Sequence, residues 1–150
     1  MATTPRPTGL PNMDPAIYPA LSTVEARLAA SGVEPALMKL VKLRASQLNG
    51  CAFCLDMHAR DARAMGETDQ RLDLVAGWRD AGVYTDRERA ALGWAEALTK
   101  LDPAGLAGAR AAMEAAFSAA EMAHVTMAIG MINLWNRVMP GLDIHPPLRG

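Results

Sequence analysis

Residues 40–58 read LVKLRASQLNGCAFCLDMH, and they hold both cysteines of the chain and one of its three histidines. The apolar residues before Asn49-Gly50 recur at helical spacing, and an Asn-Gly pair ends helices. We therefore expect one helix to end there and a second helix to begin at Cys51. Because each residue turns about 100° around an α-helix, Cys51, Cys54 and His58 lie on one stripe of that second helix. Cys54 and His58 are i and i+4 neighbours, about one turn apart.

This stripe has the parts of a redox site. A thiol becomes a thiolate at neutral pH when a base or a positive charge lies beside it, and a second thiol can resolve its oxidised form as a disulfide. The first amides and the dipole of the helix favour a thiolate at Cys51, and their influence extends over the first turn toward Cys54. Two other interpretations stay open: two inert buried thiols, or a zinc site of Cys51, Cys54 and His58 with one open position. A structural zinc would need a fourth ligand, and His124 and His145 have no paired spacing, so we expect no metal and no cofactor.

The composition excludes several classes of protein. A chain of 150 residues is long enough for one domain with a core. With 21% charged residues and a net charge of −1, it has no electrostatic basis for binding nucleic acid or an anionic membrane. Residues 1–7 lack the apolar segment of a signal peptide, and the uncharged stretch 122–136 is too short to span a bilayer. Two cysteines three residues apart do not make a secreted disulfide scaffold, so we expect a cytoplasmic location.

The sequence favours helix almost throughout. Alanine supplies 29 of the 150 residues, and no stretch alternates as a strand does. Start and stop signals predict helices over 14–31, 34–49, 51–65 and 68–82, a helix from Thr85 past Leu98, one from Asp102, and a last one over 118–138. Prolines near both ends divide the chain into an extended arm (1–13), a helical domain (14–139) and a coil tail (140–150). The last helix is apolar on nearly all sides, so we expect a partner subunit to cover part of it.

Residues 40–58 closely resemble the AhpD-like, carboxymuconolactone decarboxylase family. The resemblance continues, over roughly residues 15–138, in the segments 66–72 (GETDQRL), 78–79 (WR), 85–92 (TDRERAAL), 95–98 (AEAL) and, more weakly, 132–137 (INLWNR). It implies an all-α, AhpD-like domain of about six to seven helices. It also implies that the chain assembles as a homo-oligomer, either a trimer or a hexamer.

The resemblance implies a thiol-dependent peroxidase, alkylhydroperoxidase-like, or a disulfide reductase, with electrons from a dithiol or protein reductant. Cys51 and Cys54 match the redox pair of the family, and His58 matches its relay histidine. We expect Cys54, beside His58, to attack peroxide and Cys51 to resolve the product, although the reverse order stays open. The alternatives are a non-enzymatic redox-sensing oligomer, and a cofactor-free lactone or carbonyl enzyme of the decarboxylase branch, which generally lacks the cysteine pair.

Two positions depart from the family pattern. The family glutamate that accepts the thiol proton, twelve residues before the first cysteine, is Lys39 here, and Ala52-Phe53 replaces a histidine that some members carry between the cysteines. A protonated lysine cannot accept a proton, so Lys39 either stabilises a thiolate by its charge or faces solvent. Glu96, in a segment that recurs in the family, is a candidate substitute acid.

Overall fold

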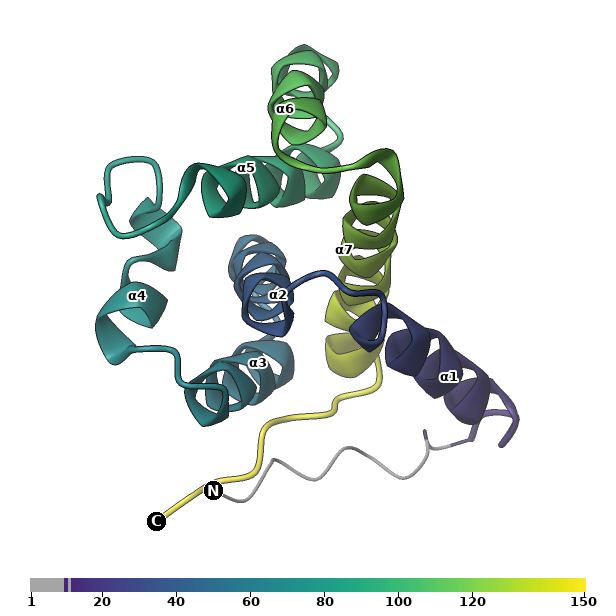
Figure 1. Ribbon diagram of the computed structural model, residues 1–150. Helices are drawn as coiled ribbons and strands as arrows, with labels where there is room; N and C mark the ends of the chain where they lie inside the picture. The colour runs from purple at the N-terminus through teal and green to yellow at the C-terminus, as the bar shows by residue number, and fades with distance from the viewer. Residues whose placement is uncertain (1–9, 11) are drawn as a thin grey trace.

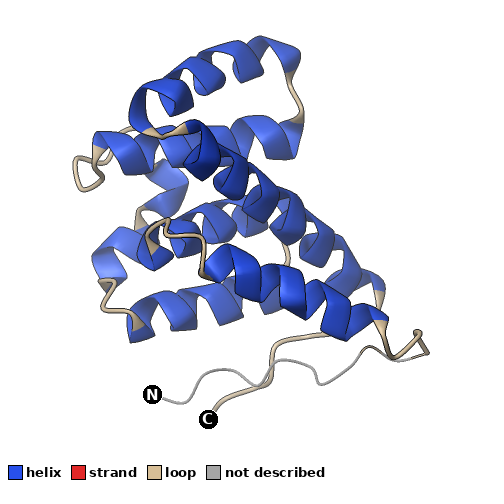
Figure 2. Ribbon diagram, turned by 45° about the vertical axis from the view of Figure 1, so that its right-hand side comes forward, coloured by secondary structure: helices blue, strands red, loops and turns tan. Residues whose placement is uncertain are grey.

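The computed structural model describes residue 10 and residues 12–150, and that part of the chain is built of helices (Figures 1 and 2). It contains seven α-helices, one short 3₁₀ helix and no strand: α1 (Ile17–Ala29), α2 (Pro35–Asn49), α3 (Ala52–Ala64), α4 (Asp69–Asp73), η1 (Val75–Gly77), α5 (Asp86–Lys100), α6 (Pro103–Ala116) and α7 (Ala119–Gly141). The predicted all-α class and number of helices are confirmed. The extended arm expected over 1–13 lies largely outside the described residues.

The helix α2 lies at the centre of the molecule. It contacts α3, α5 and α7, which surround it in Figure 1, while α6 packs outside α5 and α1 contacts α7. The predicted apolar stripe of α2 is buried at Leu37, Leu40 and Val41. Lys39 and Lys42 are buried on the same helix, although neither belongs to the apolar stripe. Burying a lysine costs free energy unless it is paired, so the partners of these two side chains are central to the site described below.

The helix expected over 68–82 is interrupted, which corrects the sequence interpretation. Its start is as predicted, because the hydroxyl of Thr68 caps α4. After α4 the chain tightens into η1, in which three residues make one turn and side chains three apart lie on one side. Val75 and Trp78 are thereby both buried, at 0% and 7% exposure. Gly77 weakens any continuous α-helix at this point, because glycine loses the most backbone freedom on folding.

Local capping signals set the starts of α5 and α7. Thr85 and Ser118 each accept a backbone hydrogen bond from the glutamate three residues later, whose side chain bonds back to the cap, as the sequence predicts. The end of α7 was predicted wrongly. The helix does not stop near Val138 but continues through Pro140 to Gly141. Pro140 has no N–H to donate to the carbonyl four residues earlier, and the helix ends one residue after it.

The apolar helix α7 is covered within the single chain more fully than its sequence suggests. It packs against α1, α2, α3, α5 and α6, and Met127 is the large apolar side chain that it leaves exposed, at 55%. On α1, Ile17 and Val24 are 44% and 37% exposed. The expected oligomer stays a prediction. Within the described residues, every helix is too short or too polar to cross a membrane.

Candidate functional site

A tight turn between α2 and α3 places the cysteines. Gly50 ends α2 in the left-handed conformation, with φ of 72°, and its N–H donates to the carbonyl of Ser46 at 2.8 Å. This conformation suits glycine, because the Cβ atom of any other residue makes a positive φ sterically unfavourable. Cys51 follows as the N-cap of α3, and its Sγ accepts a hydrogen bond from the backbone N–H of Cys54 at 3.3 Å. Both sulfurs therefore lie at the positive end of the α3 dipole, where a thiolate is stabilised.

Cys51 and Cys54 are joined by a disulfide, with their Cα atoms 5.3 Å apart. Each residue is 1% exposed, so exposure does not decide which thiol attacks first. They belong to a small apolar cluster with Phe53, Ile132 and Met139, against which Leu10 and Ile144 also pack. Leu10, from before α1, and Ile144, from the tail after α7, therefore contribute to the cluster that contains the pair. A thiolate, and not a disulfide sulfur, is the metal-binding form of cysteine, so this oxidised pair is not a zinc site in the state observed.

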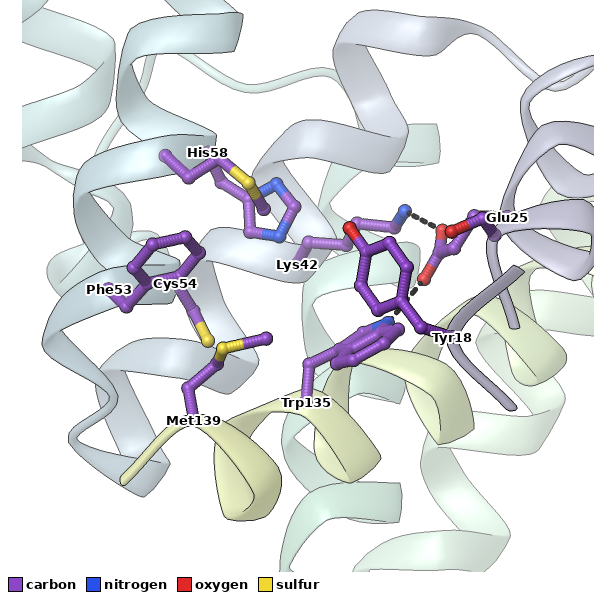
Figure 3. A pocket seen from close by; sticks show the side chains of 10 residues that line it. Tyr18, Glu25, Lys42, Phe53, Cys54, His58, Trp135 and Met139 are labelled. Atoms are coloured by element: carbon purple, nitrogen blue, oxygen red, sulfur yellow. Dashed lines mark hydrogen bonds and ion pairs between the residues drawn. The ribbon is translucent and has the colours of Figure 1, made fainter. Parts of the chain in front are cut away.

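A small cavity of about 40 Å³ opens beside Cys54, and Cys51 is not part of its wall. Figure 3 shows Cys54 and His58 contributed by α3 on one side and Tyr18 and Glu25 contributed by α1 on the other. The wall is formed by Tyr18, Ser22, Glu25, Lys42, Phe53, Cys54, Met57, His58, Trp135 and Met139. The cavity is therefore mostly apolar and aromatic, with one redox sulfur, one imidazole and one ion pair on its surface.

That ion pair consists of Lys42 and Glu25, a residue that the sequence analysis did not select. The Lys42 ammonium lies 2.8 Å from a carboxylate oxygen of Glu25, and both side chains are 11% exposed. The indole N–H of Trp135 donates to the other oxygen of the same carboxylate at 3.0 Å. Glu25 therefore ties α1 to α2 and α7 across the cavity (Figure 3). Nothing local to α1 signals this role, because it depends on how three helices pack.

Lys39 does not face solvent. It is 9% exposed, and its Nζ lies 2.7 Å from Oδ2 of Asp61 and 3.5 Å from Nδ1 of His58. Asp61 follows His58 by three residues on α3, so both face α2 from the same side of the helix. His58 is itself only 3% exposed. The solvent-facing interpretation of Lys39 is therefore wrong, and the lysine that replaces the family glutamate contacts the imidazole directly. The i+3 spacing of Asp61 was a signal in the sequence that the analysis did not use.

Glu96 lies in a different environment. It is 4% exposed, and its carboxylate accepts hydrogen bonds from Arg44 at 2.8 Å, from the indole of Trp78 at 2.8 Å, and from Arg79. Burial opposes ionisation of this carboxyl, but the three donors outweigh it and hold the pKa of Glu96 below its usual range. Glu96 is not among the residues that line the cavity beside Cys54. Its surroundings are those of a buried anion that holds α2, α5 and the segment after η1 together.

The other two histidines lie apart from this site. His145 pairs at the surface with Asp143, whose carboxylate is 2.8 Å away. His124 has a buried Nδ1 with no hydrogen-bond partner in the described structure. Among the described residues, no group of three or more histidine, cysteine, aspartate or glutamate side chains is arranged to hold a metal ion.

A fold of seven α-helices with α2 at its centre, and a C-x-x-C-x-x-x-H sequence at the start of α3, define an AhpD-like protein. Residues 15–97 match the carboxymuconolactone decarboxylase family, and the chain belongs to that family.

Three relatives extend this assignment. The uncharacterized protein YdfG of Bacillus subtilis (strain 168) is 35% identical over 109 residues, 72% of this chain and 74% of YdfG. The uncharacterized protein YnjA of Escherichia coli (strain K12) is 32% identical over 76% of this chain, which spans 63% of YnjA. A crystal structure of a protein of unknown function from Agrobacterium tumefaciens, for which a role in antioxidant defence as AhpD has been suggested, superposes with a TM-score of 0.86. It shares 41% sequence identity and covers 91% of this chain and 94% of its own.

Proposed function

We propose that this protein reduces peroxides with the Cys51/Cys54 pair, at the expense of a dithiol or protein reductant. The observation that carries the proposal is the geometry at the start of α3: a disulfide-forming pair at a helix N-terminus, with Cys54 and His58 in the wall of one cavity. Family membership and the suggested antioxidant role of the Agrobacterium relative support it. A cytoplasmic location, where such reductants keep thiols reduced, is part of the proposal.

The reaction balances with these two residues and one external dithiol. The Cys54 thiolate attacks one peroxide oxygen, the O–O bond breaks, and Cys54 becomes a sulfenic acid while the other oxygen leaves and is protonated as water or an alcohol. The Cys51 sulfur then attacks the sulfenic sulfur, water leaves, and the observed disulfide forms. An external dithiol transfers two electrons to this disulfide by thiol–disulfide exchange and is itself oxidised. Cys54 has the attacking role because it, and not Cys51, borders the cavity.

Single serine variants test this assignment. With peroxide and a dithiol in excess, the wild-type protein should turn over many times. Cys54→Ser should not consume peroxide. Without dithiol and with one equivalent of peroxide, Cys51→Ser should retain a sulfenic acid that a diketone probe traps and mass spectrometry locates. Sulfenic acid trapped on Cys51 in the Cys54→Ser protein would reverse the order of the two cysteines. Absence of any thiol oxidation in the wild type would refute the proposal.

A redox sensor is the second candidate, and the burial of the pair favours it. Both cysteines are 1% exposed, and a bulky protein reductant cannot reach the sulfurs in this conformation. A sensor would be oxidised once and would then stay oxidised in the presence of a dithiol. Steady-state peroxide consumption therefore separates the two functions, since only an enzyme continues past one equivalent.

A further inference from the structure

A group of polar side chains connects the end of α2 to α7, directly before the cysteine pair. This asparagine network consists of Ser46 and Asn49 on α2 and Asn133 and Asn136 on α7. Nδ2 of Asn49 donates to Oδ1 of Asn133 and to Oδ1 of Asn136, each at 2.9 Å. Nδ2 of Asn136 donates to Oγ of Ser46 at 3.0 Å. Ser46 and Asn136 are buried, so little water competes for these hydrogen bonds.

Asn136 is the residue of α7 that bonds to both members of the network on α2. Ser46 and Asn49 are three residues apart, so they lie on the same face of α2, toward α7, which packs beside α2 (Figure 1). The direction of the bonds is fixed chemically, because Oδ1 of Asn133 also accepts from the guanidinium of Arg137 at 3.2 Å. An oxygen that accepts from an arginine must accept from Asn49 as well, which makes Asn49 the donor.

The network reaches Cys51 through the backbone of Ser46. The carbonyl of Ser46 accepts from the N–H of Gly50 at 2.8 Å and from the N–H of Cys51 at 3.2 Å. Its hydroxyl accepts from Asn136 and donates to the carbonyl of Lys42 at 2.8 Å. The residue whose carbonyl binds the cysteine turn is therefore itself fixed to α7 through its side chain.

The same face of α7 packs against the two sulfurs. Ile132 lies four residues before Asn136 and Met139 lies three residues after it, so the three side chains share one face of the helix. Ile132 and Met139 belong to the apolar cluster that contains Cys51 and Cys54. One face of α7 therefore both encloses the pair and fixes the turn that leads into it.

We propose that Asn136, with Ser46 and Asn49, is a positioning residue that holds the Cys51 turn in the conformation that the disulfide requires. In the reduced protein the network limits the freedom of this turn, so the Cys51 sulfur stays near that of Cys54 and less conformational entropy is lost when the disulfide forms. The network therefore makes the disulfide harder to reduce. The inference concerns the thiol–disulfide equilibrium of the folded protein, and it rests on the proposed function only for its role in turnover.

Equilibration with a small dithiol tests the proposal. The dithiol loses two electrons and two protons and closes to its own disulfide, while the bond between Cys51 and Cys54 breaks and each sulfur takes one proton. Releasing the backbone of about one residue corresponds to about tenfold in an equilibrium constant. The constant for reduction should therefore rise about tenfold in Asn136→Ala, or by about 30 mV in reduction potential. Alkylation and mass spectrometry measure the reduced fraction, and an unchanged or lower constant would overturn the proposal.

Thr126→Val is the matched control. Thr126 also belongs to α7, and its hydroxyl accepts from the indole N–H of Trp94 on α5 at 2.9 Å, so valine likewise removes a side-chain hydrogen bond between α7 and a neighbouring helix. Thr126 precedes Asn136 by ten residues, which is about 15 Å along the helix. The constant for reduction in Thr126→Val should equal that of the wild type. Equal rises in the two variants would show general loosening and would overturn the proposal.

Urea unfolding of the oxidised and the reduced protein separates positioning from stability. A bond with only a structural role stabilises both redox forms equally, whereas the proposed role requires Asn136→Ala to destabilise the oxidised form more, by the same factor of about ten in the unfolding constant. Equal losses in the two forms would refute the positioning role. Should Asn136→Ala not fold, Asn49→Ala removes the donor to Asn136 at a partly buried position and should raise the constant for reduction in the same direction. An unchanged constant in Asn49→Ala would then overturn the proposal.

Peroxide treatment connects the network to turnover. With a loosened Cys51, the sulfenic acid on Cys54 should be resolved more slowly, so excess peroxide should convert more of Cys54 to sulfinic acid in Asn136→Ala than in the wild type or Thr126→Val. Equal amounts of sulfinic acid in the three proteins would count against the positioning role. Absence of peroxide consumption in every variant, together with the expected shift of the dithiol equilibrium, would refute only the peroxidase.

Discussion

The carboxylate of Glu96 offers a sharp test of how this fold is held together. It is 4% exposed and accepts from Arg44, whose side chain is 13% exposed, from Trp78, and from Arg79, whose side chain is 64% exposed. Only the contact to Arg79 reaches open solvent, so the bonds to Arg44 and Trp78 carry most of the energy. Removing one partner of a buried ion pair costs about 3 to 5 kcal/mol. Because glutamine can still accept from the indole, we expect Glu96→Gln to lower the free energy of unfolding by about 3 kcal/mol.

Urea unfolding followed by far-ultraviolet circular dichroism measures this loss, and Asp69→Asn is the control. Asp69 makes the same kind of contact, to Arg63 at 2.6 Å, but its side chain is 78% exposed. An exposed pair contributes about 0 to 1 kcal/mol, so the control should unfold almost as the wild type does. A loss below about 1 kcal/mol in Glu96→Gln, or equal losses in the two variants, would refute the argument from burial.

The difference in free energy of unfolding between the wild type and Glu96→Gln should depend on pH in one definite direction. The pKa of Glu96 is lowered in the folded protein, although burial alone would raise it, because its three donors favour the carboxylate. The stabilisation is therefore complete above the unfolded value of ~4.3 and is lost as pH falls through the lower folded pKa. The stability gap between the wild type and Glu96→Gln should narrow in acid and remain constant from about pH 5 to 8. Loss of peroxide turnover in folded Glu96→Gln would instead support Glu96 as the substitute acid.

Three further predictions concern the oligomeric state, the Lys39–Asp61 pair and the C-terminal tail. Sedimentation at micromolar concentration should give an oligomer, since α1 exposes apolar side chains, and a 16.0 kDa species would contradict this. Lys39→Glu places a second carboxylate beside Asp61, so the free energy of unfolding should fall by about 3 kcal/mol or more; an unchanged urea midpoint would show that the pair is not buried in solution. Arg149 binds Asp56 at 3.0 Å and holds the tail near α3, so Arg149→Ala should let a small dithiol reduce the disulfide severalfold faster. Equal rates of thiol release would show that the tail does not limit access.

The features that the sequence predicts correctly are the local ones. The capping residues Thr85 and Ser118 can be predicted because a cap and its glutamate are three residues apart in the sequence. The start of the C-x-x-C helix can be predicted because Gly50 comes directly before it. The break after α4 was missed, because it depends on burying Val75 and Trp78 against other helices. The partners of the site were missed for the same reason. Glu25 comes from α1, which is distant in the sequence. The buried side chain of Lys39 is paired with Asp61 on α3, a contact that depends on how α2 and α3 pack.

The Cys51 sulfur has two tasks at once, because the atom that enters the disulfide also caps α3 by accepting from the Cys54 amide at 3.3 Å. A thiolate is a much better hydrogen-bond acceptor than a neutral disulfide sulfur. Reduction and deprotonation of Cys51 therefore strengthen the first hydrogen bond of α3, and oxidation weakens it. The amide of Cys54 should accordingly exchange its hydrogen with solvent more slowly in the reduced protein, so that the backbone itself reports the redox state of the pair.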